Sequence, residues 1–114
     1  MIDYTPTLVA TLSNILPVYH EMTLVRGTET PCISYMETNN YATDTGDTLG
    51  YSRLAYQIKV WGMDIAELNM YAQLIDAALR PLGWTRAQSG ELYDRNSAMI
   101  QKILQYEARA YETF

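Results

Sequence analysis

The chain is short of the residue types from which most catalytic and nucleic-acid-binding sites are built. It has one histidine (His20), one cysteine (Cys32) and two lysines among 114 residues. A single cysteine excludes an internal disulfide and any cysteine-based metal cluster. The six arginines form no basic run and the net charge is −5, so the composition argues against tight binding of DNA or RNA phosphates.

Sequence signatures of common enzymes are also missing. The chain has no glycine-rich phosphate loop, no GxSxG motif and no HExxH motif. No segment approaches the ~18 consecutive apolar residues of a transmembrane helix, and the first residues lack the basic and apolar regions of a signal peptide. We therefore predict a non-enzymatic protein with no catalytic residue, no cofactor, no metal and no membrane partner, made in a cytoplasm.

The remaining composition is that of one globular domain spanning residues 1–114. Apolar residues make up 48% of the chain and charged residues 18%, which argues against disorder. A domain of this length buries roughly two-thirds of its unfolded surface, enough for a core. The ten tyrosines hint at protein interfaces, although β-rich folds also use tyrosine.

The most informative segment begins at Leu49 with a long alternating stretch. Strict alternation over 52–60 predicts a half-buried strand whose register is fixed, because a shift of one residue would bury Arg53 and Lys59. The even-numbered side chains expected in the core are Leu54, Tyr56, Ile58 and Val60. The odd-numbered side chains expected on the other face include Tyr51, Arg53, Gln57, Lys59 and Trp61.

A helix is predicted next, over 64–82. Asp64 suits the N-cap, with Glu67 completing a capping-box-like pair, and Pro81 and Gly83 suit the end. The apolar stripe recurs at spacings of three and four and should cover the core face of the strand. Its members are Ile65, Leu68, Tyr71, Ala72, Leu74, Ile75, Ala78, Leu79 and Leu82.

The flanking regions complete an α+β fold in the order α-β-β-β-α-β-β, with a mostly antiparallel sheet and two helices packed on one face. A first helix is predicted over 4–16, capped by Asp3 or Thr5 with Pro6 in its first turn. Segments 18–25 and 32–38 are predicted to form a β-hairpin. A short strand over 84–88 should precede turns at Ser89-Gly90 and at 93–97, and 98–111 is predicted as a strand in preference to a helix.

Residues 39–50 (NNYATDTGDTLG) are predicted to form a long loop, because they combine turn formers with no periodicity. The loop includes Tyr41, Asp44, Gly46 and Asp47. The last three resemble a fragment of a calcium loop, but the closing acidic residue is absent, so a flexible loop is the better interpretation. We expect it to be weakly ordered in a monomer and to order on assembly.

Few side chains suggest chemistry on their own. His20 lies on the apolar parity of its strand, and Cys32 follows Pro31 at a strand start, as a small buried hydrophobe would. Trp61 and Trp84 flank the central helix. They either plug its two ends or provide an exposed aromatic anchor for a partner.

Several segments together resemble the small tail completion, or tail terminator, proteins of long-tailed phages with non-contractile tails. They are the strand 51–61 (YSRLAYQIKVW), the helix 64–82, Gly83-Trp84, the segment 91–94 (ELYD) and the segment 99–107 (MIQKILQYE). The resemblance covers most of the chain and lies in pattern and spacing rather than in one diagnostic motif. Related neck proteins, including those described as minor capsid proteins, have similar length and composition.

The resemblance implies a virion protein of the tail or neck, made in the cytoplasm of a bacterial host. It implies a ring, commonly a hexamer, that ends the tail tube and joins it to the head connector or stopper protein. DNA passes through such a ring without specific binding, which suits an acidic chain. The loop at 39–50 matches, in position, a mobile loop of such rings.

Our interface hypothesis is the non-core face of the central strand, since aromatics and arginine are enriched in interfaces. Its members are Tyr51, Arg53, Gln57, Lys59 and Trp61. A head-to-tail ring uses two different patches on each subunit, so a monomer in isolation is compatible. Two other classes stay open: a connector adaptor or tube subunit, and a ferredoxin-like module binding a small ligand in a pocket lined by Tyr35, Tyr56 and Trp61.

Overall fold

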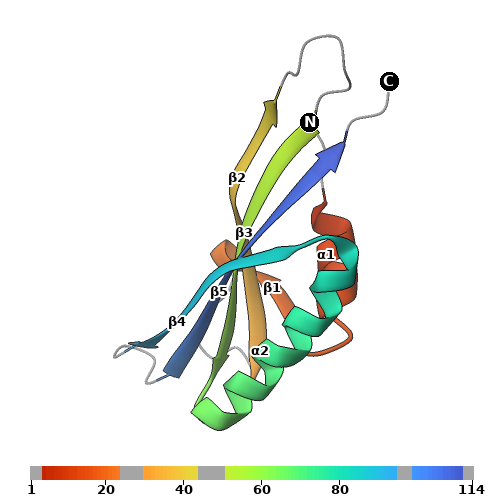
Figure 1. The fold of residues 1–114 in the computed structure, drawn as a ribbon. Helices are drawn as coiled ribbons and strands as arrows, with labels where there is room; N and C mark the ends of the chain where they lie inside the picture. The colour runs from red at the N-terminus through yellow and green to blue at the C-terminus, as the bar shows by residue number, and fades with distance from the viewer. Residues whose placement is uncertain (1–3, 24–29, 44–50, 95–98, 112–114) are drawn as a thin grey trace.

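A computed structural model describes residues 4–23, 30–43, 51–94 and 99–111, and has the expected α+β architecture (Figure 1). Its elements are α1 (Thr5–Leu12), β1 (Val18–His20), the 3-10 turn η1 (Glu21–Thr23), β2 (Cys32–Thr43), β3 (Tyr51–Gly62), α2 (Ile65–Leu79), the 3-10 turn η2 (Arg80–Leu82), β4 (Thr85–Asp94) and β5 (Met99–Tyr111). The predicted order and the mostly antiparallel sheet are confirmed.

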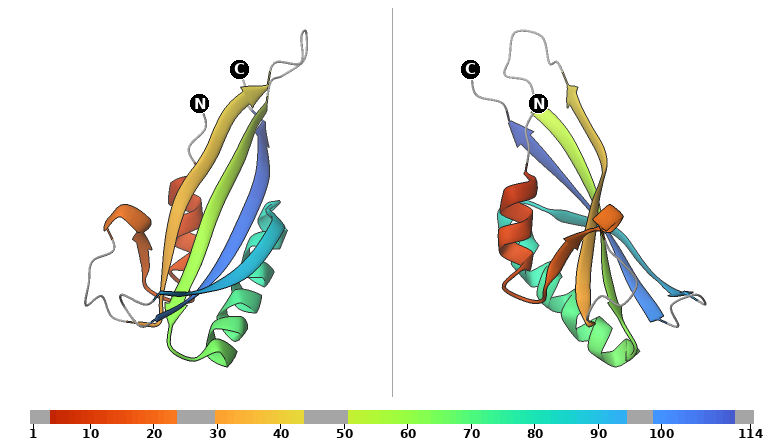
Figure 2. Two further views of the ribbon diagram at one scale, coloured as in Figure 1. Left: turned by 90° about the vertical axis from the view of Figure 1, so that its left-hand side faces the viewer. Right: turned by 180° about the vertical axis from the view of Figure 1, so that it is seen from behind.

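β3 is the centre of a five-stranded sheet in the order β1-β2-β3-β5-β4. It pairs antiparallel with β2 on one side and with β5 on the other. The strand prediction for 98–111 is therefore confirmed, because β5 pairs along the whole length of β3. In Figures 1 and 2 the three long strands extend past both helices and form an arm at one end of the molecule.

The core lies between one face of this sheet and the two helices, which cover the same face (Figure 2). The even-numbered residues of β3 from Leu54 to Val60 are each at most 1% exposed, so the predicted register is confirmed. From the helices, the fully buried leucines and isoleucine are Leu8, Leu12, Leu68, Ile75 and Leu79. Trp84 closes the core with its ring edge-on to Tyr4 and Tyr56.

α2 begins and ends where its sequence predicts. The Asp64 carboxylate accepts a hydrogen bond from the Ala66 N–H at 3.0 Å, which satisfies one of the unpaired donors of the first turn. Gly83 follows η2 in the left-handed conformation (φ 90°), which a side chain would disfavour. Three members of the predicted stripe are exposed rather than buried: Ile65 (36%), Leu74 (47%) and Leu82 (47%). Ile65 and Leu82 lie at the two ends of the helical segment, whereas Leu74 lies in its middle. Leu74 precedes the buried Ile75 and so points roughly 100° away from it around the helix.

The first helix and the first strand pair differ from the prediction. α1 is shorter than 4–16, and Tyr4 rather than Asp3 or Thr5 occupies the N-cap position without a side-chain cap. β1 ends at His20 and η1 begins at Glu21, and β1 pairs with β2 in parallel rather than as a hairpin. Alternation over 18–25 does not predict the end of β1 at His20. The Thr23 hydroxyl donates a hydrogen bond to the His20 carbonyl, which closes a local turn after the strand.

Two turn predictions also fall inside strands. β2 runs to Thr43, so Tyr41 belongs to a strand paired with β3, and the loop prediction is wrong over 39–43. Asp44, Gly46 and Asp47 lie outside the described residues. Ser89 and Gly90 lie within β4, paired with Leu104 and Ile103 of β5, so no turn occurs there. Partner strands override local turn propensity at both places. None of the described helices is long and apolar enough to span a membrane.

Candidate interaction surface

The face of the sheet opposite the helices is called here the open face, and strand alternation defines it. Gln57, Lys59 and Trp61 project from β3 onto it, since their even-numbered neighbours are buried on the other side. The backbones of Tyr51 and Arg53 continue β3 into the arm, where they pair with β2 and β5. Their side chains are outside the described part of the structure.

The side chains of Trp61 and Lys59 interact with other residues of the same molecule. The Trp61 indole N–H donates to the Ser34 hydroxyl at 2.8 Å, and the Lys59 ammonium lies 5.8 Å from the Trp61 ring centroid. Lys59 also forms an ion pair with Glu21 of η1, and both side chains are about one-fifth exposed (18% and 21%). This end of the open face is therefore pre-organised, and neither side chain is a freely exposed anchor.

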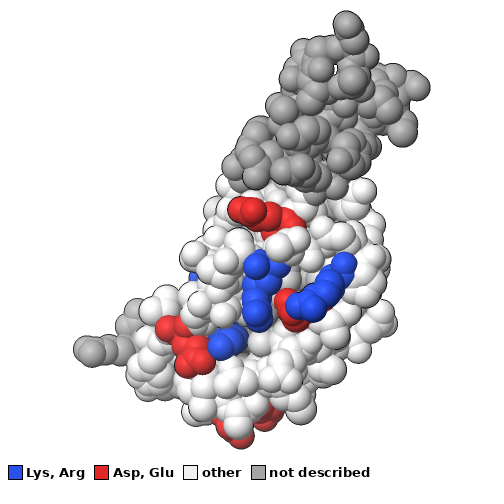
Figure 3. All heavy atoms as spheres, viewed as in Figure 1, with Lys and Arg blue, Asp and Glu red and all other residues white. Residues whose placement is uncertain are grey.

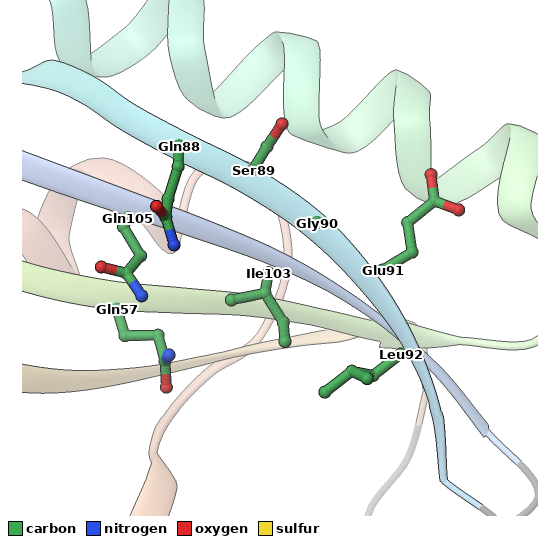
Figure 4. Close-up of a pocket in the computed structure, with 8 residues that line it drawn as sticks. All are labelled: Gln57, Gln88, Ser89, Gly90, Glu91, Leu92, Ile103 and Gln105. Atoms are coloured by element: carbon green, nitrogen blue, oxygen red, sulfur yellow. The ribbon is translucent and has the colours of Figure 1, made fainter.

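Farther along the open face lies a shallow depression of about 210 Å³ across β3, β5 and β4. Figure 4 shows Gln57, Gln105 and Gln88 in a row over the three strands, with Ile103 and Leu92 beside them. The register places Gln105 opposite both Gln57 and Gln88. The side chains that line the depression on this side of the sheet are uncharged.

The space beside Gly90 is open, because a Cβ built there would meet no atom within 4 Å. The charged residue of this region, Glu91, points to the helix side of the sheet and binds Lys102 at 3.0 Å. The alternation of β3 predicts that Gln57 lies on this face, but the sequence pattern did not identify the other residues of the depression. The missed signal is the alternation of Gln88, Gly90 and Leu92, which the Ser89-Gly90 turn prediction obscured.

The side chains suspected of chemistry have structural roles. The His20 ring accepts the Met22 N–H at 3.1 Å and packs edge-on against Tyr35, with ring centroids 5.2 Å apart. Cys32 is buried, and burial raises the pKa of its thiol, which disfavours the nucleophilic thiolate. Among the described residues, no group of three His, Cys, Asp or Glu side chains could hold a metal ion.

The proposed ligand pocket of Tyr35, Tyr56 and Trp61 is wrong. Tyr35 pairs with Ile58 and packs against the core, and Tyr56 is 1% exposed inside it. Trp61 lies on the open face, on the other side of the sheet. Strand parity separates the three rings, so they cannot line one cavity.

The charged groups around the core are paired rather than collected in a patch. The Tyr106 hydroxyl donates to Asp76 at 3.0 Å, and the other oxygen of Asp76 binds Arg80 at 2.9 Å. Burial raises the pKa of the Tyr106 phenol, and the hydrogen bond to Asp76 and the charge of Asp76 raise it further. Basic and acidic side chains lie side by side on the face shown in Figure 3, without an extended region of one sign.

Comparison with known proteins shows the fold. The sequence matches no protein-family model, and no curated protein matches it. A chain of a solved structure described as the "Virion of native gene transfer agent (GTA) particle" superposes with a TM-score of 0.64 at 16% identity. The match covers 92% of this chain and 84% of that chain, so the two share one fold over nearly their whole lengths.

Proposed function

We propose that the protein is a structural component of a phage or phage-like virion. The observation that carries this proposal is the shared fold with a virion chain over 92% of this protein and 84% of the other. The described residues fit a structural role, because His20 and Cys32 are occupied in packing and no three-ligand metal cluster is present among them.

Within the virion, we propose that it forms a ring in the neck that ends the tail tube and joins it to the head connector. The sequence resemblance to tail terminators supports this position, and the hexamer is the ring that the resemblance implies. The net charge of −5 and the interspersed charges of Figure 3 suit a passage that DNA crosses without being held. The open face, which includes Gln57, Lys59 and Trp61, is the proposed contact surface.

Removal of the gene from the genome that encodes it tests this position. Loss of a tail terminator should leave DNA-filled heads without tails, together with free tails of irregular length. Loss of a tube subunit should leave no tails at all, and loss of a connector adaptor should leave tails of normal length. Normal numbers of complete particles would refute a structural role.

The mass of the purified protein gives a second, independent test. Light scattering over a range of protein concentrations should show a monomer that gives way to one discrete ring, without intermediate species of indefinite length. A monomer that binds a small ligand stoichiometrically, and does not associate even at tail-tube ends, would favour the ligand-binding module instead.

A further inference from the structure

The second helix carries an apolar stripe that faces away from the core. Its buried stripe is Leu68, Ala72, Ile75 and Leu79, whereas Met70 and Leu74 on the other side are 49% and 47% exposed. Ala66, Gln73 and Ala77 complete this second stripe, and all three are exposed. Met63 and Leu82 extend it beyond the two helix ends, at 73% and 47% exposure.

This outer stripe is unusual for a surface helix, which normally presents charged residues to water. Its only polar member is Gln73, and the charged residues of α2, Glu67 and Asp76, are half-buried at its margins. Five of the eight large hydrophobic side chains that are exposed among the described residues belong to this helix and its flanks. A contiguous apolar patch of this kind marks an interaction site.

The depression on the open face is polar but uncharged, with the amides of Gln57, Gln88 and Gln105 beside Ile103 and Leu92. It is concave, whereas a helix is convex, and the side chains that line it on that side are uncharged. Neither surface would bury an unpaired charge against the other, which is the costly outcome at an interface. Neither of the described α-helices covers the open face, so that face has room for a helix of a second molecule.

We propose that the outer stripe of α2 on one copy packs into the depression of the next copy. The two surfaces lie on opposite sides of the sheet, so the stripe and the depression of one molecule cannot pack against each other. Repetition of this contact places the copies head to tail, the arrangement that closes into a ring when the rotation fits. This inference rests on the proposed ring and names its two contacting surfaces.

Cysteine cross-linking tests the contact directly. In a Cys32→Ala background, Leu74→Cys marks the stripe and Gln88→Cys marks the rim of the depression, and both positions are exposed. With a short bis-maleimide, the double variant should give a ladder of dimers, trimers and higher species. A 1:1 mixture of the two single variants should stop at dimers, because each chain then carries one reactive end.

Control variants distinguish this contact from random collisions and from contacts between other surfaces. Thr7→Cys on exposed α1, combined with Gln88→Cys, gives the background from random collisions, and the ladder should exceed it at least tenfold. Dimers from Leu74→Cys alone would show that α2 packs against α2 and would overturn the proposal. A ladder no stronger than the Thr7→Cys control would overturn it as well.

The two proposals fail in different ways. If deletion of the gene leaves particle yield unchanged, the virion role fails, whatever the cross-linking shows. If deletion abolishes particles and the ladder is absent, the virion role stands and the α2 contact is wrong. Circular dichroism of each variant, and of the Cys32→Ala background in which a buried side chain is shortened, tests whether the fold persists.

Discussion

Two leucines on one helix give a matched test of how α2 packs. Leu79 is fully buried and Leu74 is 47% exposed, although both lie in α2 and the sequence pattern assigns both to the core. Leu79→Ala removes three carbon atoms from a core shared with Ile58, Ile75 and Trp84. At about 0.8 kcal/mol for each group, the transfer loss is roughly 2.4 kcal/mol. The cavity left behind extends the expected range to about 2–5 kcal/mol.

Leu74→Ala removes the same atoms from a half-exposed site. The transfer loss should be about half as large, on the order of 1 kcal/mol, and the higher helix propensity of alanine offsets a few tenths of it. Urea unfolding followed by circular dichroism measures both variants. The midpoint should fall much further for Leu79→Ala, with an unchanged denaturant slope.

The concentration of protein matters for this comparison, because association of the folded state raises its apparent stability. The measurement therefore belongs at a concentration where light scattering shows a monomer. Equal losses for the two variants, or a larger loss for Leu74→Ala, would refute the assignment of Leu79 to the core face and of Leu74 to the outer stripe.

Three further substitutions probe single interactions. The pKa of Tyr106 is raised in the folded state, so the unfolded chain loses the phenol proton at a lower pH than the folded chain does. The protonated Tyr106 should therefore stabilise the fold below about pH 10, the usual tyrosine value, and this stabilisation should decline above that pH. Tyr106→Phe should reduce this alkaline loss in pH-dependent unfolding, and an unchanged loss would contradict the environment of Tyr106. Asp64→Ala should cost about 1 kcal/mol in urea unfolding, since it removes the N-cap of α2; no change would contradict the cap. Gly83→Ala should cost about 1–2 kcal/mol because φ is 90°, and a neutral result would contradict that conformation.

The parts of the fold that the sequence predicted correctly are those with a strong local period. The alternation of β3 identifies Leu54, Tyr56, Ile58 and Val60 as buried, and the spacing and caps of α2 locate its two ends. These signals suffice because a strand with one buried face and an amphipathic helix each have one stable orientation.

The predictions that failed depended on contacts distant in sequence. Asn39–Thr43 and Ser89-Gly90 have loop-like composition, yet both are held in strands by partners on β3 and β5. The parallel pairing of β1 with β2 is also set by the sheet rather than by the residues between them. For the candidate surface, alternation found Gln57, Lys59 and Trp61, but it could not show that Glu21 and Ser34 engage the last two.

The most direct test of the proposed virion role is to look for the protein in virus-like particles purified from cells that carry its gene. Antibodies raised against the folded protein and visualised by electron microscopy should label one site per particle, at the junction of head and tail. Quantitative mass spectrometry of the same particles should give about six copies, the number that the resemblance implies. Absence of the protein from purified particles, or label spread along the whole tail, would contradict the proposed ring in the neck.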